Sequence, residues 1–406
     1  SGVMPYDLDR IIERRGSDSE KWRRYGPDVL PLWVADMDFQ SPEPVIRALS
    51  ERVGHGVFGY GCEPPELREL LVERMHRLYG WQIAPEALVF LPGVVTGFNL
   101  CCRAFAAPGD GVLVQTPVYP PILRAWRNAR LERREMELTR LSDGTYAVDY
   151  DAFERALRDG TRVFILCNPH NPVGRVFRRD ELERMAETCL RLGVLICSDE
   201  IHCDLLFSES RHLPIAALAP EVAARTITLM APSKTFNIAG LNCAFAIVTG
   251  QALREALQLA GRGLAGEPCI LAYAAATAAY RDGQPWLDSV LRYLEANRDY
   301  LLRELTTRLP GVRMARPEGT FLAWLDCRDA GIPGNPAEFF LQHARVAVND
   351  GTTFGQGGEG FVRLNFGCPR ALLEEGLRRM QRALEGLQSG RDVQPTVDDR
   401  QTGQAG

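Results

Sequence analysis

Short apolar runs alternate with longer amphipathic segments through the middle of the chain. The apolar runs predict buried strands at 87–91, 111–115, 162–167, 193–198, 226–230 and 242–248. Between several of these runs, apolar residues recur at helical spacing, as they do over 178–193. Near-continuous apolar strands separated by helices are typical of an α/β fold with a mostly parallel sheet covered on both faces. Such sheets bind ligands at the carboxyl ends of their strands.

The pattern changes near Trp286, where a long charged helix is predicted over 286–309. It leads into a region with apolar strands within 319–327 and 360–367. Because 406 residues are too many for one ordinary hydrophobic core, we expect two domains. The predicted division is a large domain at 51–285 and a small α+β domain at 286–388, to which residues 1–50 contribute. The polar composition of 389–406 predicts a disordered tail.

Composition and charge exclude several classes of protein. The net charge of -5 and the isoelectric point near 5.8 argue against a nucleic-acid partner. The longest stretch of small apolar residues, 270–280, is too short to cross a bilayer, so no membrane partner is expected. The N-terminus has no apolar secretory segment, which favours a cytoplasmic location.

The eleven cysteines favour neither disulfides nor a metal site. Their number is odd and no Cys-x-x-Cys pair occurs. Most of them lie inside apolar runs, as Cys167 and Cys197 do, and Cys101 and Cys102 lie in a predicted helix. We therefore expect buried thiols in a reducing compartment and no metal ion.

Two predicted strands end in residues that suit a ligand. Gly93 follows the strand at 87–91 and opens a predicted helix, where backbone N–H groups can bind an anion. A glycine at such a junction is also common for purely geometric reasons. The segment "CNPHNPVG" places Asn168 and Asn171 after a buried strand, and its prolines stiffen the backbone that carries both side-chain amides. A plain turn is the alternative interpretation.

Two further strands end in ionisable residues. Asp199 follows a strongly apolar strand, so it should face a cation or a strong donor unless it merely caps a helix. Lys234 stands in "LMAPSKTFNIAG", between the hydroxyls of Ser233 and Thr235. It could extend to the surface, but a buried lysine with a lowered pKa forms imines with carbonyl compounds.

Together these strand ends meet the needs of pyridoxal 5′-phosphate. The lysine holds the cofactor aldehyde as an imine, the carboxylate keeps the pyridine nitrogen protonated, and the helix start holds the phosphate. The chain resembles fold-type I pyridoxal-phosphate enzymes, with "WVADMDF", "GYG", "TPVYPP", "NPHNPVG", "SDEIHCDL", "SKTFNIAGL" and "RLNFGCPR" in family order. Within the class I/II aminotransferase superfamily it resembles the branch of cystathionine β-lyases and cysteine C–S lyases, which includes a lyase-like modulator of the maltose regulon.

The resemblance implies a seven-stranded sheet in the large domain and a role for each motif residue. Lys234 binds the cofactor covalently and removes the substrate α-proton, while Asp199 pairs with the ring nitrogen and Tyr119 stacks on the ring. The implied cofactor contacts further include Gly93, Val94, Asn168, Asn171, His202 and Ser233. Arg363 and the Ala35 backbone should hold the substrate carboxylate, with Asn171 and Tyr60 also near the substrate. Tyr60 should reach the phosphate of the neighbouring subunit, which implies a homodimer with shared active sites.

One departure from the aminotransferase pattern guides the choice of reaction. Aminotransferases of this fold usually carry an arginine eight residues after the lysine, and here that position is Asn242. The lyase branch also lacks this arginine, so we expect β-elimination on an L-cysteine S-conjugate or L-cystathionine, giving thiol, pyruvate and ammonia. An aminotransferase and a regulatory binding protein that keeps the cofactor are the alternatives.

Overall fold

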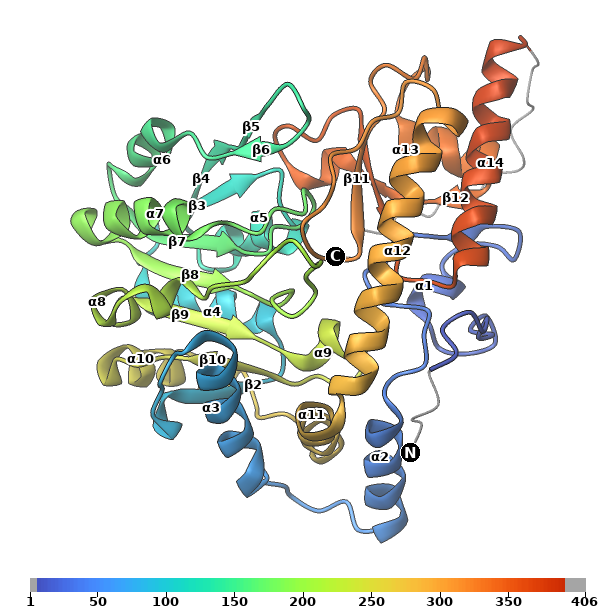
Figure 1. Ribbon diagram of the computed structural model, residues 1–406. Coiled ribbons are helices and arrows are strands. Elements are labelled where there is room, and N and C mark those ends of the chain that lie inside the picture. The colour runs from blue at the N-terminus through green and yellow to red at the C-terminus, as the bar shows by residue number, and fades with distance from the viewer. Residues whose placement is uncertain (1–5, 391–406) are drawn as a thin grey trace.

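A seven-stranded sheet forms the centre of the larger part of the molecule (Figure 1), within the described residues 6–390 of this computed structural model. Its order is β2 (Leu88–Leu91), β10 (Ala244–Ile247), β9 (Thr226–Met230), β8 (Leu195–Asp199), β7 (Thr161–Cys167), β3 (Gly111–Thr116) and β4 (Glu132–Glu137). Only β10 runs antiparallel to its neighbours. The mostly parallel sheet and the predicted α/β class are therefore confirmed.

Alternating residues of each strand build a hydrophobic core on each face of the sheet. In β7, Val163, Ile165 and Cys167 pack on one face, and Phe164 and Leu166 pack on the other. The first face is covered by α4 (Val94–Phe105), α5 (Pro120–Asn128) and α10 (Gln251–Gly261). The second is covered by α3 (Pro65–Tyr79), α6 (Tyr150–Leu157), α7 (Arg179–Leu192) and α11 (Ile270–Asp282).

The helix α7 shows how the local sequence sets an element. Leu182, Met185, Ala186 and Cys189 recur at helical spacing, and all four are buried. The Glu181 carboxylate accepts a hydrogen bond from the backbone N–H of Arg178, which closes the first turn. Gly193 ends the helix with a φ of 68°, a left-handed conformation that glycine adopts without strain. Helix α7 thus agrees with the amphipathic pattern over 178–193.

The long helix α12 (Gln284–Arg308) runs past the sheet to the C-terminal part of the molecule (Figure 1). There an antiparallel sheet has the order β11 (Leu322–Asp326), β14 (Phe361–Asn365) and β13 (Asn349–Asp350). The strand β1 (Leu30–Pro31) pairs in parallel with β12 (Val346–Ala347), so a segment from the first fifty residues packs with the C-terminal part. This pairing is compatible with the predicted domain division, which stays a prediction. The expected tail at 389–406 lies largely outside the described residues.

The remaining elements are short or flank the two parts. They are α1 (Glu20–Arg23), α2 (Glu43–His55), β5 (Thr139–Arg140), β6 (Tyr146–Ala147), α8 (Pro220–Ala223), α9 (Pro232–Thr235), α13 (Pro336–Phe339) and α14 (Arg370–Gln388). Among residues 6–390, no helix combines the length and the apolar character needed to cross a membrane. Nine of the cysteines are buried, and Cys62 and Cys269 are exposed.

Candidate active site

The predicted strand ends meet at one edge of the large sheet. Because β2, β3, β7, β8 and β9 are mutually parallel, their carboxyl ends lie on the same side. Asp199 is the last residue of β8, and Lys234 lies in α9 directly after β9. Tyr119 follows β3, and its backbone N–H donates to the Asn171 carbonyl 3.0 Å away. Residues up to 115 positions apart are thus brought together by strand order.

Lys234 carries an amine without an acidic partner. Its Nζ donates a hydrogen bond to the Ala35 carbonyl at 2.8 Å, and it forms no ion pair within residues 6–390. Burial, reinforced by the positive charge of Arg363, lowers the pKa of Lys234 to about 8, against opposing effects of Asp36 and Asp199. An amine with such a pKa is partly neutral near neutral pH, so it can attack an aldehyde or accept a proton.

Asp199 is a deeply buried carboxylate. Burial and the neighbouring Glu200 raise its pKa to about 7, while the backbone N–H of Ile201 and the charge of Lys234 act in the opposite direction. Such a carboxylate becomes fully ionised when a cation is placed beside it, as a protonated ring nitrogen would be. Burial also raises the pKa of Tyr119 to about 12, so its hydroxyl is neutral.

Arg363 is a buried guanidinium that pairs with no carboxylate in the described chain. Its Nη1 donates to Asn171 Oδ1 at 3.2 Å, and its Nη2 donates to the Trp33 carbonyl at 3.1 Å and to Asn349 Oδ1 at 2.8 Å. Burial lowers the pKa of Arg363 to about 10, and its Nε has no partner. A buried cation with only neutral partners is a ready receptor for a carboxylate.

His202 is close enough to Lys234 and Arg363 for both charges to affect its pKa. It is buried, its Nδ1 has no partner among the described residues, and its ring meets Phe321 edge-on. Burial, with the charges of Lys234 and Arg363, lowers its pKa to about 3, so the imidazole is neutral. A neutral ring nitrogen can donate or accept a hydrogen bond without adding a third charge.

The start of α4 is open, as a phosphate site requires. Gly93 has a φ of -174°, an extended conformation open to any residue, and a Cβ there would meet no protein atom within 4 Å. Neither backbone strain nor packing therefore explains the glycine, and the space it leaves lies at a helix N-terminus. With the amine of Lys234 and the carboxylate of Asp199, this cradle fits pyridoxal 5′-phosphate.

The other predicted site residues differ in their burial and contacts. Asn168 accepts a hydrogen bond from the Phe177 N–H at 3.0 Å, and its Nδ2 is buried without a partner in the described chain. Ser233 directly precedes Lys234 in α9, and Val94 is the first residue of α4, next to Gly93. Tyr60 is fully exposed, in a loop that it shares with the exposed Val57 and Phe58. Asn242 is also exposed.

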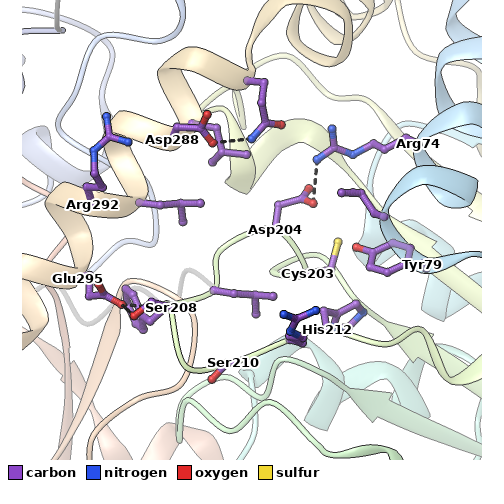
Figure 2. A pocket seen from close by; sticks show the side chains of 17 residues that line it. Arg74, Tyr79, Cys203, Asp204, Ser208, Ser210, His212, Asp288, Arg292 and Glu295 are labelled. Atoms are coloured by element: carbon purple, nitrogen blue, oxygen red, sulfur yellow. Dashed lines mark hydrogen bonds and ion pairs between the residues drawn. The ribbon is translucent and has the colours of Figure 1, made fainter.

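Polar contacts behind the site support its two ionisable residues. A cavity of about 530 Å³ is lined by Asp204 and His212, and Figure 2 shows Asp204 paired with Arg74, at 2.8 Å. The other Asp204 oxygen accepts from Thr235, the neighbour of Lys234, at 3.0 Å. His212 Nε2 lies 2.6 Å from Glu200 Oε1, next to Asp199. None of the predicted site residues lines this cavity.

Sequence reasoning missed three residues that contact Arg363. Trp33 and Asn349 accept hydrogen bonds from Arg363, and the Phe354 ring lies 5.2 Å from its guanidinium carbon. Trp33 begins the "WVADMDF" motif and could have been found there. Asn349 and Phe354 carry no sequence signal, because their role depends only on where β13 and the turn after it lie.

Comparison with known proteins identifies the family. Residues 27–380 match the family model for class I and II aminotransferases. The chain belongs to this family. It is 42% identical to the cystathionine β-lyase PatB of Bacillus subtilis, over 93% of this chain and all of that one.

Two solved structures extend the likeness to the fold. That of OvoB has a TM-score of 0.89 at 46% identity and covers 93% of this chain and 99% of its own. The structure of cystalysin from Treponema denticola, described as containing pyridoxal 5′-phosphate, has a TM-score of 0.91 at 32% identity and covers 95% and 100%. At the level of the family, the predictions of a fold-type I fold, of this cofactor and of the carbon–sulfur lyase class are confirmed.

Proposed function

We propose that the chain is a pyridoxal-phosphate-dependent carbon–sulfur lyase that acts by β-elimination on L-cysteine S-conjugates or L-cystathionine. The observation that carries the proposal is a pair of cations, the half-buried Lys234 and the buried Arg363, neither of which pairs with a carboxylate within residues 6–390. The Lys234 amine can react with a cofactor aldehyde and accept an α-proton. The Arg363 guanidinium can bind the carboxylate of an amino acid. The relatives named as lyases support the choice of reaction.

The proposed role of each residue follows from its chemical group. Lys234 would hold the cofactor, Asp199 its ring nitrogen and the start of α4 its phosphate. When bound, pyridoxal 5′-phosphate supplies an electron sink for the charge that develops at the substrate Cα. Arg363 has two Nη atoms that can bind both oxygens of the α-carboxylate in place of their present neutral partners. The Lys234 amine then takes the α-proton, a step typically worth about two to four orders of magnitude in rate.

The proposal includes a homodimer with shared sites. Its support is the exposed loop that carries Val57, Phe58 and Tyr60, since clustered exposed aromatic and apolar side chains mark protein contacts. Tyr60 would complete the phosphate site of the partner subunit. Light scattering of the purified protein should give twice the chain mass, and Tyr60→Phe should weaken cofactor binding.

Product analysis tests the reaction directly. The holoenzyme is supplied with L-cystathionine and with several S-alkyl cysteines, and pyruvate and free thiol are measured. Equal amounts of both products support the proposal. Conversion of the cofactor to its amine form, without thiol release, would identify an aminotransferase instead. Stable cofactor binding with neither outcome would favour a regulatory binding protein.

A second test uses the lysine content of the chain. It contains two lysines, Lys21 and Lys234. Borohydride reduction of the holoenzyme followed by peptide mass spectrometry should place the cofactor on Lys234 alone. Label on Lys21, or on neither lysine, would contradict the assignment.

A further inference from the structure

Side chains from distant parts of the chain bind the carbonyl groups of one short segment, Trp33–Phe39. Two of these carbonyls contact the proposed reaction residues: Arg363 donates to that of Trp33 and Lys234 to that of Ala35. Asparagine side chains bind most of the others. The segment therefore connects the proposed carboxylate receptor to the proposed base.

Asn365 lies two residues after Arg363, at the end of β14. Its Nδ2 donates to the carbonyls of Val34 and Asp36, both at 2.7 Å. Its Oδ1 accepts from the Gly367 N–H at 2.7 Å. The side chain is buried, and these three contacts are all with backbone groups. Asn365 thus holds the carbonyls on either side of Ala35.

Asn237 lies three residues after Lys234 and binds the same segment from the other side. Its Oδ1 accepts from the Met37 N–H at 2.9 Å, and its Nδ2 donates to the carbonyls of Met37 and Phe39 at 2.8 and 2.9 Å. Its φ is 56°, a left-handed conformation that asparagine tolerates better than most residues. The Asn237 carbonyl also accepts from Ser41 Oγ at 2.7 Å.

We propose that Asn237 and Asn365 are positioning residues for the lyase reaction. By binding the backbone on both sides of Ala35, they fix the distance between the Lys234 amine and the Arg363 guanidinium. The inference rests on the proposed function, because it takes the roles of Lys234 and Arg363 from it. An amide is suited to this task, since it donates to carbonyls and accepts from an N–H without adding charge.

The matched control is Asn297 in α12. It is also fully buried, and its Nδ2 donates to the carbonyls of Phe366 and Cys368 at 3.0 and 2.9 Å. Its Oδ1 accepts from Arg370 Nε at 2.8 Å. It therefore makes the same kind of contact with a segment that bears neither Lys234 nor Ala35.

The experiment compares Asn237→Ala, Asn365→Ala and Asn297→Ala as holoenzymes. Each is measured for KM and kcat with an S-alkyl cysteine, for the dissociation constant of L-alanine by cofactor absorbance, and for the urea midpoint. L-Alanine has a carboxylate and an amine but no leaving group, so its binding is measured without elimination. Loss of one positioning hydrogen bond corresponds to about a tenfold effect.

Asn365→Ala should raise KM and the L-alanine dissociation constant about tenfold, with kcat within threefold of the parent. Asn237→Ala should lower kcat about tenfold and leave L-alanine binding within threefold. Asn297→Ala should lower the urea midpoint as much as the other two while leaving KM, kcat and L-alanine binding unchanged. Two results would overturn the inference. The first is that all three variants, at matched stability, change KM, kcat and L-alanine binding equally. The second is that Asn237→Ala and Asn365→Ala change these constants less than twofold.

Two provisions keep the outcome interpretable. If an alanine variant does not fold, the isosteric Asn→Asp variant at the same position replaces it under the same criteria. If the parent binds L-alanine but releases no thiol from any conjugate, the proposed function fails. The L-alanine constants of Asn365→Ala and Asn297→Ala then still decide whether Asn365 positions the carboxylate receptor.

Discussion

Two clusters of largely buried cations contact the Ala35–Asp38 segment, and they are built in opposite ways. In the first, Lys21 Nζ lies 2.7 Å from Asp38 Oδ2, and Arg14 binds both Asp36 and Asp38. In the second, Lys234 and Arg363 donate hydrogen bonds only to carbonyl and amide oxygens within residues 6–390. The cations of the first cluster are neutralised by carboxylates of the protein. Those of the second can be neutralised by an anionic ligand.

The pKa values follow from this difference. Burial disfavours the charge of Lys21, but Asp38 and Asp36 more than compensate and raise its pKa above the usual value. Burial, the largest cause, and the positive charge of Arg363 lower the pKa of Lys234 to about 8, against the opposing effects of Asp36 and Asp199. A buried lysine therefore becomes structural or reactive according to the carboxylates within reach.

Removing the reactive amine should have the largest effect. Lys234→Ala should reduce pyruvate release by about two to four orders of magnitude or more, because the base and the covalent link to the cofactor are both lost. With cofactor removed from both proteins, the urea midpoint of the variant should not fall below that of the parent, since a half-buried cation without an ionic partner is removed. Retention of parental pyruvate and thiol release would refute the role of Lys234.

Removing the structural lysine should act on stability. Lys21→Met should lower the free energy of unfolding by about 3–5 kcal/mol, because Asp38 is left buried with its ion pair to Arg14 alone. Urea titration of parent and variant measures the difference. An unchanged midpoint would mean that the two clusters do not differ in the way proposed.

The guanidinium of the reactive cluster should govern substrate affinity. Arg363→Lys keeps the positive charge but loses the planar pair of donors, so KM for an S-alkyl cysteine should rise roughly 10- to 100-fold. In Arg363→Lys, kcat should change far less than KM, whereas Lys234→Ala removes the base itself. The two variants therefore separate substrate binding from the chemical step. A loss confined to kcat would place Arg363 outside the carboxylate receptor.

The smallest effect is a pH dependence of stability in the protein without cofactor. Folding lowers the pKa of Lys234 from 10.5 to about 8, so between these values the unfolded chain binds the extra proton. Stability of the parent relative to Lys234→Met should therefore rise as the pH increases from 8 to 10.5, by at most about 1.4 kcal/mol per pH unit. Paired urea titrations at pH 7.5, 9 and 10 test the slope, and a flat or falling difference would contradict it.

Local patterns were sufficient for most elements of the large sheet. The apolar run predicted at 226–230 coincides with β9, because its residues are buried on both faces. Strand β4 (Glu132–Glu137) was missed, since "ERREME" has the composition of a solvated helix. As an edge strand it exposes half of its residues, and charges there discourage pairing with other chains. Its strand conformation comes from pairing with β3, which no local pattern encodes.

The sequence by itself determined which chemical groups stand at the strand ends: an amine at Lys234, a carboxylate at Asp199 and a guanidinium at Arg363. Their motifs are local and could be read in order. Only the tertiary structure decided which cations are neutralised. Asp36 and Asp38 pair with Lys21 and Arg14, whereas Lys234, about 200 positions away, donates a hydrogen bond to the Ala35 carbonyl. Ionic partners are set by distances of a few ångströms between remote segments, and these distances exist only after the chain has folded.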